Sequence, residues 1–226
     1  PVPEKLSVIE TMRAEDGRIA LWSLHRDRMR RDCAAVGFAV DEDALAARLA
    51  GIPRRGVLRL RLTVDASGTG LTHQPLAPNP DFWRAVVSDI RLDSADPWLR
   101  IKSSHRPAYD AARRAMPAGC DEAVLLNERG QVCEGTITSI FLRRGDRLLT
   151  PPLSCGLLPG VLRASLLSSG RAHEAVLHAD DLHRGDLFCG NALRGRIEPS
   201  GVRGVMCLSS RNGTTVPLAI YSRFDL

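Results

Sequence analysis

Lysine is the residue that this chain most nearly lacks. Only Lys5 and Lys102 are lysines among its 31 basic residues, and the others are arginines. Arginine carries surface charge as well as lysine does, but only lysine loses its proton at modest cost and then attacks a carbonyl carbon to form a covalent adduct. Lys102 is the one lysine in the interior of the sequence. This scarcity makes Lys102 a candidate for amine chemistry, with compositional drift as the alternative.

Motifs for membrane, disulfide or metal chemistry are also absent. No apolar run is long enough to span a bilayer, and residues 1–5 lack the basic-then-apolar order of a secretion signal. The six cysteines form neither a C-x-x-C pair nor a cluster with histidines, so we expect buried free thiols and no metal site. These absences predict a cytoplasmic protein that does not contact a membrane.

Aromatic side chains make up only 4% of the chain, and its basic residues are dispersed among 26 acidic ones. Proteins that bind RNA or single-stranded DNA usually combine a basic stripe with aromatic stacking platforms. The composition therefore argues against a nucleic-acid partner. The formal net charge of +5 instead favours small anionic ligands.

At 226 residues the chain is long enough for one large domain or two small ones. Its hydrophobic residues (44%) and charged residues (25%) occur in proportions typical of a globular protein. The proline-rich stretch 75–80 interrupts any helix or central strand. We therefore expect a small N-terminal α/β domain over residues 1–78 and a second, C-terminal domain over residues 79–226.

Apolar periodicity and turn residues predict a mixed α+β fold with many antiparallel hairpins. Ser23 and Asp41 are candidate caps at the starts of two helices, and Gly37 and Gly51 are candidate ends. Helices are expected at residues 23–36, 41–51, 107–116 and 160–169. Strands are expected at residues 6–13, 19–22, 56–64, 71–74, 83–92, 121–127, 131–134, 138–143 and 147–150.

Two segments carry side chains suited to amine chemistry. Lys102 lies in a polar loop that follows an apolar strand, and a partly desolvated lysine near other cations loses its proton more easily. Glu134 ends a predicted strand beside Gly135, where its carboxylate has room to approach a ligand. A solvated glutamate on a surface hairpin is the alternative for Glu134.

Two further segments suit a phosphate group. The stretch 156–163 is shaped by proline and glycine and leads into a helix, whose first backbone N–H groups and positive dipole end bind anions. Many junctions between a loop and a helix share this pattern. Arg28, on the first predicted helix, is able to form a bidentate phosphate contact, with an exposed basic helix face as the alternative.

The order and spacing of these segments resemble the class IV aminotransferases, which are the fold-type IV pyridoxal-phosphate enzymes. The resemblance covers roughly residues 6–199, with Glu134 following Lys102 by 32 residues. The matching segments are His25-x-x-Arg28, Lys102-Ser-Ser-x-Arg106-x-x-Tyr109, Asp121-Glu-Ala-Val-Leu-Leu-Asn-Glu-Arg-Gly130, Glu134-Gly-Thr136, Thr150-Pro-Pro, Gly156-Leu-Leu-Pro-Gly160-x-x-Arg163 and Asn191-Ala-Leu-Arg-Gly195.

The resemblance implies a role for each matching residue. Lys102 corresponds to the lysine that holds pyridoxal 5'-phosphate covalently and later moves a proton, and Glu134 to the acid that pairs with the pyridine nitrogen. Arg28 corresponds to the phosphate-binding arginine. The other residues implied to contact the cofactor are Leu158, Val161 and Leu162 at the helix start, and Asn191, Ala192 and Leu193 in a second turn. The family also implies two α/β domains and a homodimer whose active sites lie near the interface.

The substrate side matches less well than the cofactor side. Ile9 stands where relatives often have a tyrosine, and the stretch 71–73 lacks the arginine of the R-x-H carboxylate trap found in D-amino-acid aminotransferases. Ala192 and Leu193 replace a turn that often carries a hydroxyl residue, and Ser139 replaces a common asparagine. The missing arginine and the isoleucine at position 9 weigh against an aminotransferase that acts on branched-chain or D-amino acids.

Within the family, the residues of these motifs are most similar to those of the aminodeoxychorismate lyases, which form p-aminobenzoate and pyruvate for folate synthesis. An aminotransferase acting on branched-chain or D-amino acids is the main alternative, and a cofactor-free binding protein is a third. The lyase substrate carries two carboxylates, so arginines near the pocket are candidate anchors. The sequence leaves the choice open among Arg13, Arg59, Arg61 and Arg106.

Overall fold

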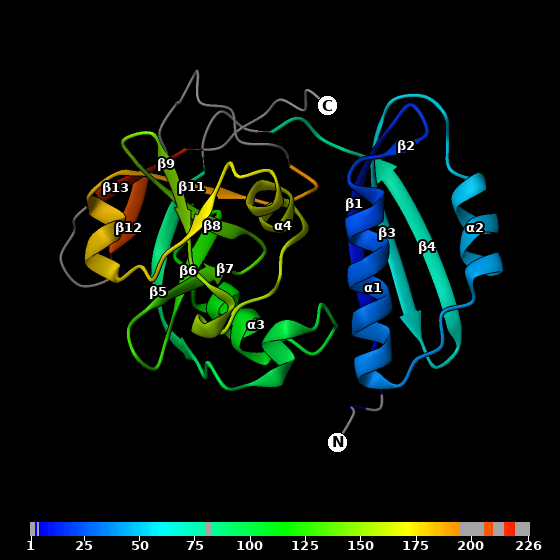
Figure 1. Ribbon diagram of the computed structural model, residues 1–226, viewed down its shortest axis with the longest axis horizontal. Helices are drawn as coiled ribbons and strands as arrows, with labels where there is room; N and C mark the ends of the chain where they lie inside the picture. Colours follow the sequence, from blue (N-terminus) through cyan, green and yellow to red (C-terminus); the bar gives the residue numbers. More distant parts are fainter. Residues whose placement is uncertain (1–2, 4, 80–82, 195–205, 210–214, 220–226) are drawn as a thin grey trace. The chain divides into compact units, whose positions relative to one another are not determined.

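The computed structural model describes residues 3, 5–79, 83–194, 206–209 and 215–219. The chain forms two compact units: residues 1–78 with 100–106, called here the first unit, and residues 79–99 with 107–226, called the second unit (Figure 1). Residues 100–106 differ from the sequence interpretation, which placed them in the C-terminal domain. They join the first unit because their backbone pairs with residues 7–9 of that unit: the Ile9 N–H donates to the Lys102 carbonyl and the Ser104 N–H to the Ser7 carbonyl, both at 2.8 Å.

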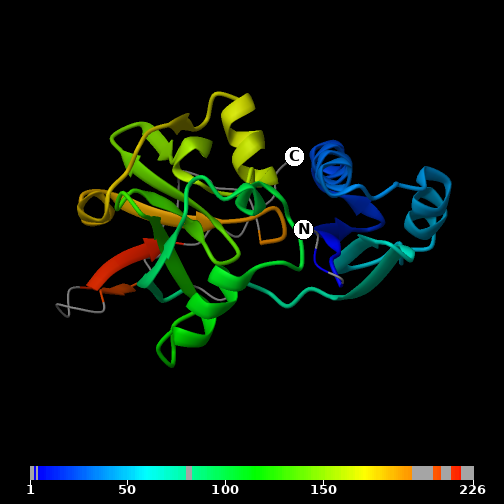
Figure 2. The ribbon, with the colours of Figure 1, turned by 90° about the horizontal axis from the view of Figure 1, so that it is seen from below.

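The first unit contains an antiparallel sheet with the strand order β2-β1-β3-β4. Its strands are β1 (Val8–Glu15), β2 (Arg18–Ile19), β3 (Val57–Asp65) and β4 (Gly68–Pro75). Side chains of β1 and β3 alternate between two faces, and the apolar side chains of one face, such as Met12 and Leu60, are buried against the helices. Helices α1 (Trp22–Val36) and α2 (Glu42–Ala50) cover this one face (Figure 2).

The helix ends follow the expected signals in three of four cases. The Asp41 side chain caps α2 by accepting the Ala44 N–H at 2.9 Å, α1 ends at Gly37 with φ +77°, and α2 ends at Gly51. The predicted cap at Ser23 is wrong. Residue 22 already begins α1, and Leu21 precedes it with φ 55°, a left-handed conformation that is strained for leucine. The strand expected at 19–22 is correspondingly shorter.

The second unit contains a nine-stranded mixed sheet with the order β10-β9-β8-β11-β13-β12-β5-β6-β7. The strands are β5 (Ala85–Leu92), β6 (Glu122–Asn127), β7 (Val132–Gly135), β8 (Ser139–Arg144), β9 (Arg147–Thr150), β10 (His173–Glu174), β11 (Asp186–Gly190), β12 (Met206–Ser209) and β13 (Thr215–Ala219). The helical segments are η1 (Pro97–Arg100), α3 (Pro107–Ala115), η2 (Leu153–Cys155), α4 (Val161–Ser168) and η3 (Ala179–His183), of which Arg100 belongs to the first unit.

Strand β6 is buried along its whole length. Val124 and Leu126 join one core cluster with strands β8 and β11, whereas Ala123 and Leu125 join another with α3 and the loop before α4. Burial on both faces explains why the sequence of β6 is a continuous apolar run rather than an alternating one. The mixture of helices, parallel pairs and hairpins confirms the predicted α+β class.

The cysteines whose side chains are described are all free. Cys33, Cys133, Cys155 and Cys189 are buried as expected, but Cys120 is only partly buried. Within the described residues, no group of histidine, cysteine, aspartate or glutamate side chains is arranged to hold a metal ion. No helix in this part of the chain has both the length and the apolar character needed to cross a membrane.

Candidate functional site

The backbone of Lys102 is fixed on two sides within the first unit. Its carbonyl accepts the Ile9 N–H of β1, and its own N–H donates to Asp32 Oδ2 of α1 at 2.8 Å. Ser103, the next residue, is buried and forms an isolated bridge with Val8. Lys102 itself is half-buried. The candidate amine therefore extends from a short segment anchored to both a strand and a helix.

The face of α1 that packs on the sheet is unusually polar. His25, Arg28 and Asp32 are buried on that face, and β1 contributes the buried Glu10. Arg28 forms two bonds to Glu10, from Nε to Oε1 at 2.7 Å and from Nη2 to Oε2 at 2.6 Å. His25 Nδ1 lies 2.7 Å from Glu10 Oε2. The guanidinium predicted to bind phosphate is thus held in one orientation by a bidentate ion pair.

Burial and charge act in opposite directions on these groups. Burial raises the pKa of Glu10, but the positive charge of Arg28 and hydrogen bonds from His25 and Arg28 outweigh it and lower that pKa to about 2. Burial lowers the pKa of His25, which favours a neutral ring that donates from Nδ1 to the carboxylate. Its Nε2 then has no hydrogen-bond partner among the described residues.

Asp32 connects α1 to the lysine segment. Burial raises the pKa of its carboxyl, and this effect is opposed by the Lys102 backbone N–H and by the charge of Arg31. Arg31 donates to Asp32 Oδ1 at 2.7 Å from Nη2. Asp32 is therefore a candidate for setting the position of Lys102, a role that sequence reasoning did not assign.

In the second unit, Glu134 is buried at the end of β7 and has two hydrogen-bond donors on the same oxygen. The Tyr109 hydroxyl donates to Oε1 at 2.6 Å and the Leu158 N–H at 2.8 Å. The alternative of a solvated surface glutamate is therefore wrong. The carboxylate is held by α3 on one side and by the loop before α4 on the other, which leaves it little freedom to rotate.

A second buried glutamate holds the turn that follows Glu134. Glu122 is fully buried, and its Oε1 accepts the Thr136 N–H at 2.8 Å and the Thr136 hydroxyl at 2.5 Å. Its Oε2 accepts the Thr138 hydroxyl at 2.8 Å and the Ile137 N–H at 3.2 Å. A Cβ atom on Gly135 would lie 2.3 Å from Thr138 Oγ1. Glycine at 135 is thus required by the close approach of this network.

The predicted helix start is open to an anion. Val161 and Leu162 are the first residues of α4, and no side chain caps this end within the described residues. Gly160 lies against strand β8, because a Cβ atom there would be 2.6 Å from Ser139 Oγ. Arg163 anchors the first turn by donating to the Pro151 carbonyl at 2.8 Å. These contacts fix the position of the free backbone N–H groups.

The second predicted turn is tied to the same region. Asn191 Nδ2 donates to the Ile137 carbonyl at 3.1 Å, so this turn contacts the segment held by Glu122. Asn191 Oδ1 accepts the Leu193 N–H at 3.1 Å and the Arg194 N–H at 2.9 Å. Within the turn, the Leu193 N–H is therefore bonded to the Asn191 side chain.

The predicted site residues fall into two groups. Arg28 and Lys102 belong to the first unit, where α1 carries the first and holds the second through Asp32. The others belong to the second unit, where Leu158 bonds Glu134 directly and Asn191 reaches the adjoining turn. The members of this second group are Glu134, Leu158, Val161, Leu162, Asn191, Ala192 and Leu193.

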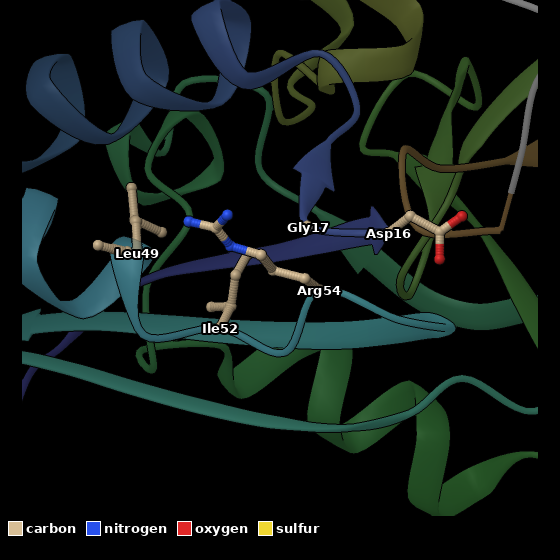
Figure 3. Close-up of a pocket in the computed structure, with 6 residues that line it drawn as sticks. Asp16, Gly17, Leu49, Ile52 and Arg54 are labelled. Atoms are coloured by element: carbon tan, nitrogen blue, oxygen red, sulfur yellow. The ribbon is translucent and has the colours of Figure 1, made fainter.

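A hollow of about 290 Å³ also lies in the first unit. It is lined by Asp16, Gly17, Leu49, Ala50, Ile52 and Arg54. The Arg54 side chain extends towards Leu49, and the Asp16 carboxylate points away from the Arg54 side chain (Figure 3). The hollow contains none of the predicted residues and brings no pair of titratable groups together, so we do not consider it the candidate site.

Three other residues of this architecture were not assigned a role from the sequence. Glu10 had a detectable signal, because it is a charged residue at a buried position of an alternating strand. Glu122 had a similar signal at the start of an apolar run. Tyr109 matched a family motif, but only the fold shows that its hydroxyl meets Glu134.

Comparison with known proteins identifies the family. The family model described as amino-transferase class IV matches residues 7–198. The chain belongs to this family. A crystal structure of a Mesorhizobium loti protein, provisionally named an amino-acid aminotransferase, has a TM-score of 0.78 and 36% identity, covering 96% of this chain and all of that one. The prediction that the chain is a class IV enzyme is confirmed.

Relatives with curated names fall into two classes of enzyme. A Schizosaccharomyces pombe protein provisionally named an aminodeoxychorismate lyase is 25% identical over 182 residues, which are 76% of this chain and 79% of that protein. A Thermotoga maritima protein provisionally named a branched-chain-amino-acid aminotransferase is 34% identical over 101 residues, which are 42% of this chain and 36% of that protein. The family membership therefore leaves the reaction undecided.

Enzymes of the class IV aminotransferase family generally use pyridoxal phosphate. The residues present suit that group. The Glu134 carboxylate, which is buried and held by the Tyr109 hydroxyl and the Leu158 N–H, suits a pyridine nitrogen, and the uncapped start of α4 suits a phosphate. The fixed guanidinium of Arg28 and the half-buried Lys102 provide the remaining expected groups.

Proposed function

We propose that this protein is a pyridoxal-phosphate-dependent aminodeoxychorismate lyase, which converts 4-amino-4-deoxychorismate to p-aminobenzoate and pyruvate. The observation that carries the cofactor assignment is the buried Glu134 carboxylate held by Tyr109 and Leu158. Support for the lyase comes from the residues of the motifs and from the S. pombe relative, of which this chain covers 79%. The missing arginine at 71–73 is a further argument against a D-amino-acid aminotransferase.

The proposal assigns a role to each of the predicted polar groups. Glu134 holds a proton at the pyridine nitrogen, and the N–H groups of Val161 and Leu162 together with Arg28 bind the phosphate. The cofactor, when bound, accepts the electron pair released at the amine-bearing carbon. Lys102 would hold the cofactor through Nζ, and its amine would take the proton from that carbon. Loss of pyruvate then leaves an aromatic ring, which drives the reaction forward.

An aminotransferase acting on branched-chain or D-amino acids is the alternative, since the T. maritima relative carries a branched-chain name. It requires the same cofactor residues but a keto acid that accepts the amine. The two reactions therefore differ in a simple way: the lyase releases pyruvate from a single substrate, whereas the aminotransferase needs a second one.

The decisive experiment measures pyruvate release from aminodeoxychorismate in the absence of any keto acid. We expect turnover by the parent chain and none by Lys102→Ala. Lys5→Ala is the matched control, because Lys5 is the other lysine of the chain and is exposed. Turnover that depends on an added keto acid would establish the aminotransferase instead.

A second experiment tests the cofactor assignment without turnover. Borohydride reduction of the loaded protein should add the cofactor mass to the peptide that contains Lys102, in the parent and in Lys5→Ala but not in Lys102→Ala. Glu134→Gln should weaken cofactor binding by about 1.5–3 kcal/mol, the usual contribution of a hydrogen bond to a charged group. If the protein is colourless and does not bind added pyridoxal phosphate, the result would favour the alternative of a cofactor-free binding protein.

We also propose that the enzyme is a cytoplasmic homodimer with active sites near the interface, and that its only small-molecule partners are the cofactor and an anionic substrate. Sedimentation equilibrium of the purified chain checks the dimer. A monomer at micromolar concentration that is fully active would contradict this part of the proposal.

A further inference from the structure

The sheet of the first unit has a second face that points away from α1 and α2. Except for Ile9, the buried apolar residues of β1 and β3 lie on the face beneath the helices, as Met12 and Leu60 illustrate. The intervening residues of both strands therefore project from the opposite face. No helix among the described residues of this unit covers that face (Figure 2).

Arginines are concentrated on this second face. Arg13 of β1 lies directly opposite Arg59 of β3, and Arg61 lies two residues further along the same strand. Their neutral cross-strand neighbours are polar: Thr11 and Thr72 flank Arg61, and Gln74 lies beside Arg59. We call Arg13, Arg59, Arg61 and the nearby Arg106 the arginine face.

The positive charge of the arginine face is only partly balanced by the protein. Arg13 forms an ion pair with the exposed Glu15 at 3.0 Å. Arg59 and Arg61 have no hydrogen bond or ion pair with any described residue, and the Nε atom of Arg59 is buried without a partner. Burial and the neighbouring charges of Arg59 and Arg106 lower the pKa of Arg61. Like charges opposite each other destabilise a sheet, so this arrangement has a cost without a ligand.

We infer that the arginine face binds a small organic anion through two carboxylates, one held near Arg13 and Arg59 and the other near Arg61 and Arg106. Opposite residues on paired strands are about 5 Å apart, and residues two apart along a strand about 7 Å. This spacing suits two carboxylates separated by one small ring better than one compact anion. The inference rests on the proposed function and names the feature of the substrate that the enzyme recognises.

The polar neighbours support a small ligand over a polymer. Thr11, Thr72 and Gln74 offer neutral hydrogen-bonding groups around the guanidinium groups. The described strands of this face carry no aromatic side chain on which a nucleotide base would stack. A monocarboxylic amino acid with an apolar side chain would leave part of the positive charge unpaired, so the arginine face disfavours branched-chain amino acids as substrates.

The test is a calorimetric titration of the cofactor-loaded protein with benzene-1,3-dicarboxylate, benzoate and inorganic phosphate. The parent should bind the dicarboxylate about tenfold more tightly than benzoate, which corresponds to one additional charge-assisted contact. Arg61→Gln and Arg59→Gln should each weaken dicarboxylate binding about tenfold, whereas Arg48→Gln, an exposed arginine of α2, should leave it unchanged. Unchanged thermal unfolding of each variant would show that folding is intact.

Three outcomes would overturn the inference. These are equal affinities for dicarboxylate and benzoate, unchanged dicarboxylate binding by the Arg59 and Arg61 variants, and displacement of the dicarboxylate by phosphate at equal concentration. The third result would assign the arginine face to a phosphate group. If pyruvate is released in the lyase assay but one of these three outcomes is found, only the inference about the arginine face is wrong. If dicarboxylates bind as expected while no pyruvate is released, the proposed function is wrong and the anion site stands.

Discussion

Each of the two units buries a glutamate near its candidate residues, but the two carboxylates are stabilised in different ways. Glu10 of the first unit is bonded by the cationic Arg28 and by His25. Glu122 of the second unit is bonded mainly by backbone N–H groups and threonine hydroxyls, with Arg113 more distant at 3.7 Å. The first arrangement depends on a partner charge, whereas the second depends on the shape of a turn.

This difference corresponds to the kind of group that each unit holds in place for a ligand. In the first unit the paired carboxylate fixes a guanidinium, so that a second anion is able to bind to a charge already in place. In the second unit the carboxylate fixes the backbone after Glu134, which also contacts the turn of Asn191. One unit therefore orients charges and the other orients backbone donors and a single carboxylate.

The largest effect should follow from removing the charge of Glu10. Glu10→Gln leaves Arg28 buried without its counter-charge, and we expect a loss of about 3–5 kcal/mol in the free energy of unfolding. Urea denaturation measures this loss. Glu15→Gln breaks the exposed pair with Arg13 and should cost at most about 1 kcal/mol. Equal losses in the two variants would show that the Glu10 pair is not buried as described.

A smaller effect is expected for the glutamate of the second unit. Glu122→Gln places an amide NH₂ against hydroxyl and N–H donors of the turn, and we expect a loss of about 1–3 kcal/mol in the free energy of unfolding. Glu128→Gln is the control, since that carboxylate is exposed in a neighbouring turn, and it should change stability far less. A Glu122→Gln loss as large as that of Glu10→Gln would remove the distinction between the two units.

The buried Glu10 should also make the stability of the protein depend on pH. The pKa of Glu10 is lowered from 4.5 to about 2, so the folded state favours its deprotonated form. The stability that Glu10 contributes is complete above about pH 4.5 and is lost as the pH falls towards 2. The parent should therefore lose more stability over this range than Glu10→Gln does. Subtracting the variant's profile removes the contributions of exposed acids such as Glu128, and parallel profiles would refute the assignment.

The smallest effect concerns the backbone of the first unit rather than its charges. Gly37 ends α1 with φ +77°, so Gly37→Ala should destabilise the protein by about 1 kcal/mol even though no atom crowds the position. Gly51 ends α2 with φ −83°, and Gly51→Ala should be neutral or slightly stabilising. Thermal unfolding measures both. Equal shifts in the two variants would show that the left-handed turn does not constrain residue 37.

Much of the fold could be predicted from local signals. Asp41, Gly37 and Gly51 mark helix ends through capping chemistry that operates within a few residues, and alternation marks β1 and β3. Ser23 misled the prediction because the chain turns at the left-handed Leu21 instead. The Glu134 carboxylate was expected beside a ligand, but its bond to Tyr109 joins residues 25 positions apart and has no local signal.

By itself the sequence determined the class of the protein, since Lys102, Glu134 and the glycine-rich start of α4 recur in a specific order along the chain. Only the tertiary structure decided that residues 100–106 pair with β1, that Asp32 holds the Lys102 backbone and that Arg28 is fixed by Glu10. The physical reason is how far apart along the chain the interacting residues lie. Motif order and helix caps are properties of neighbouring residues, whereas a buried charge finds its partner only when distant segments pack together.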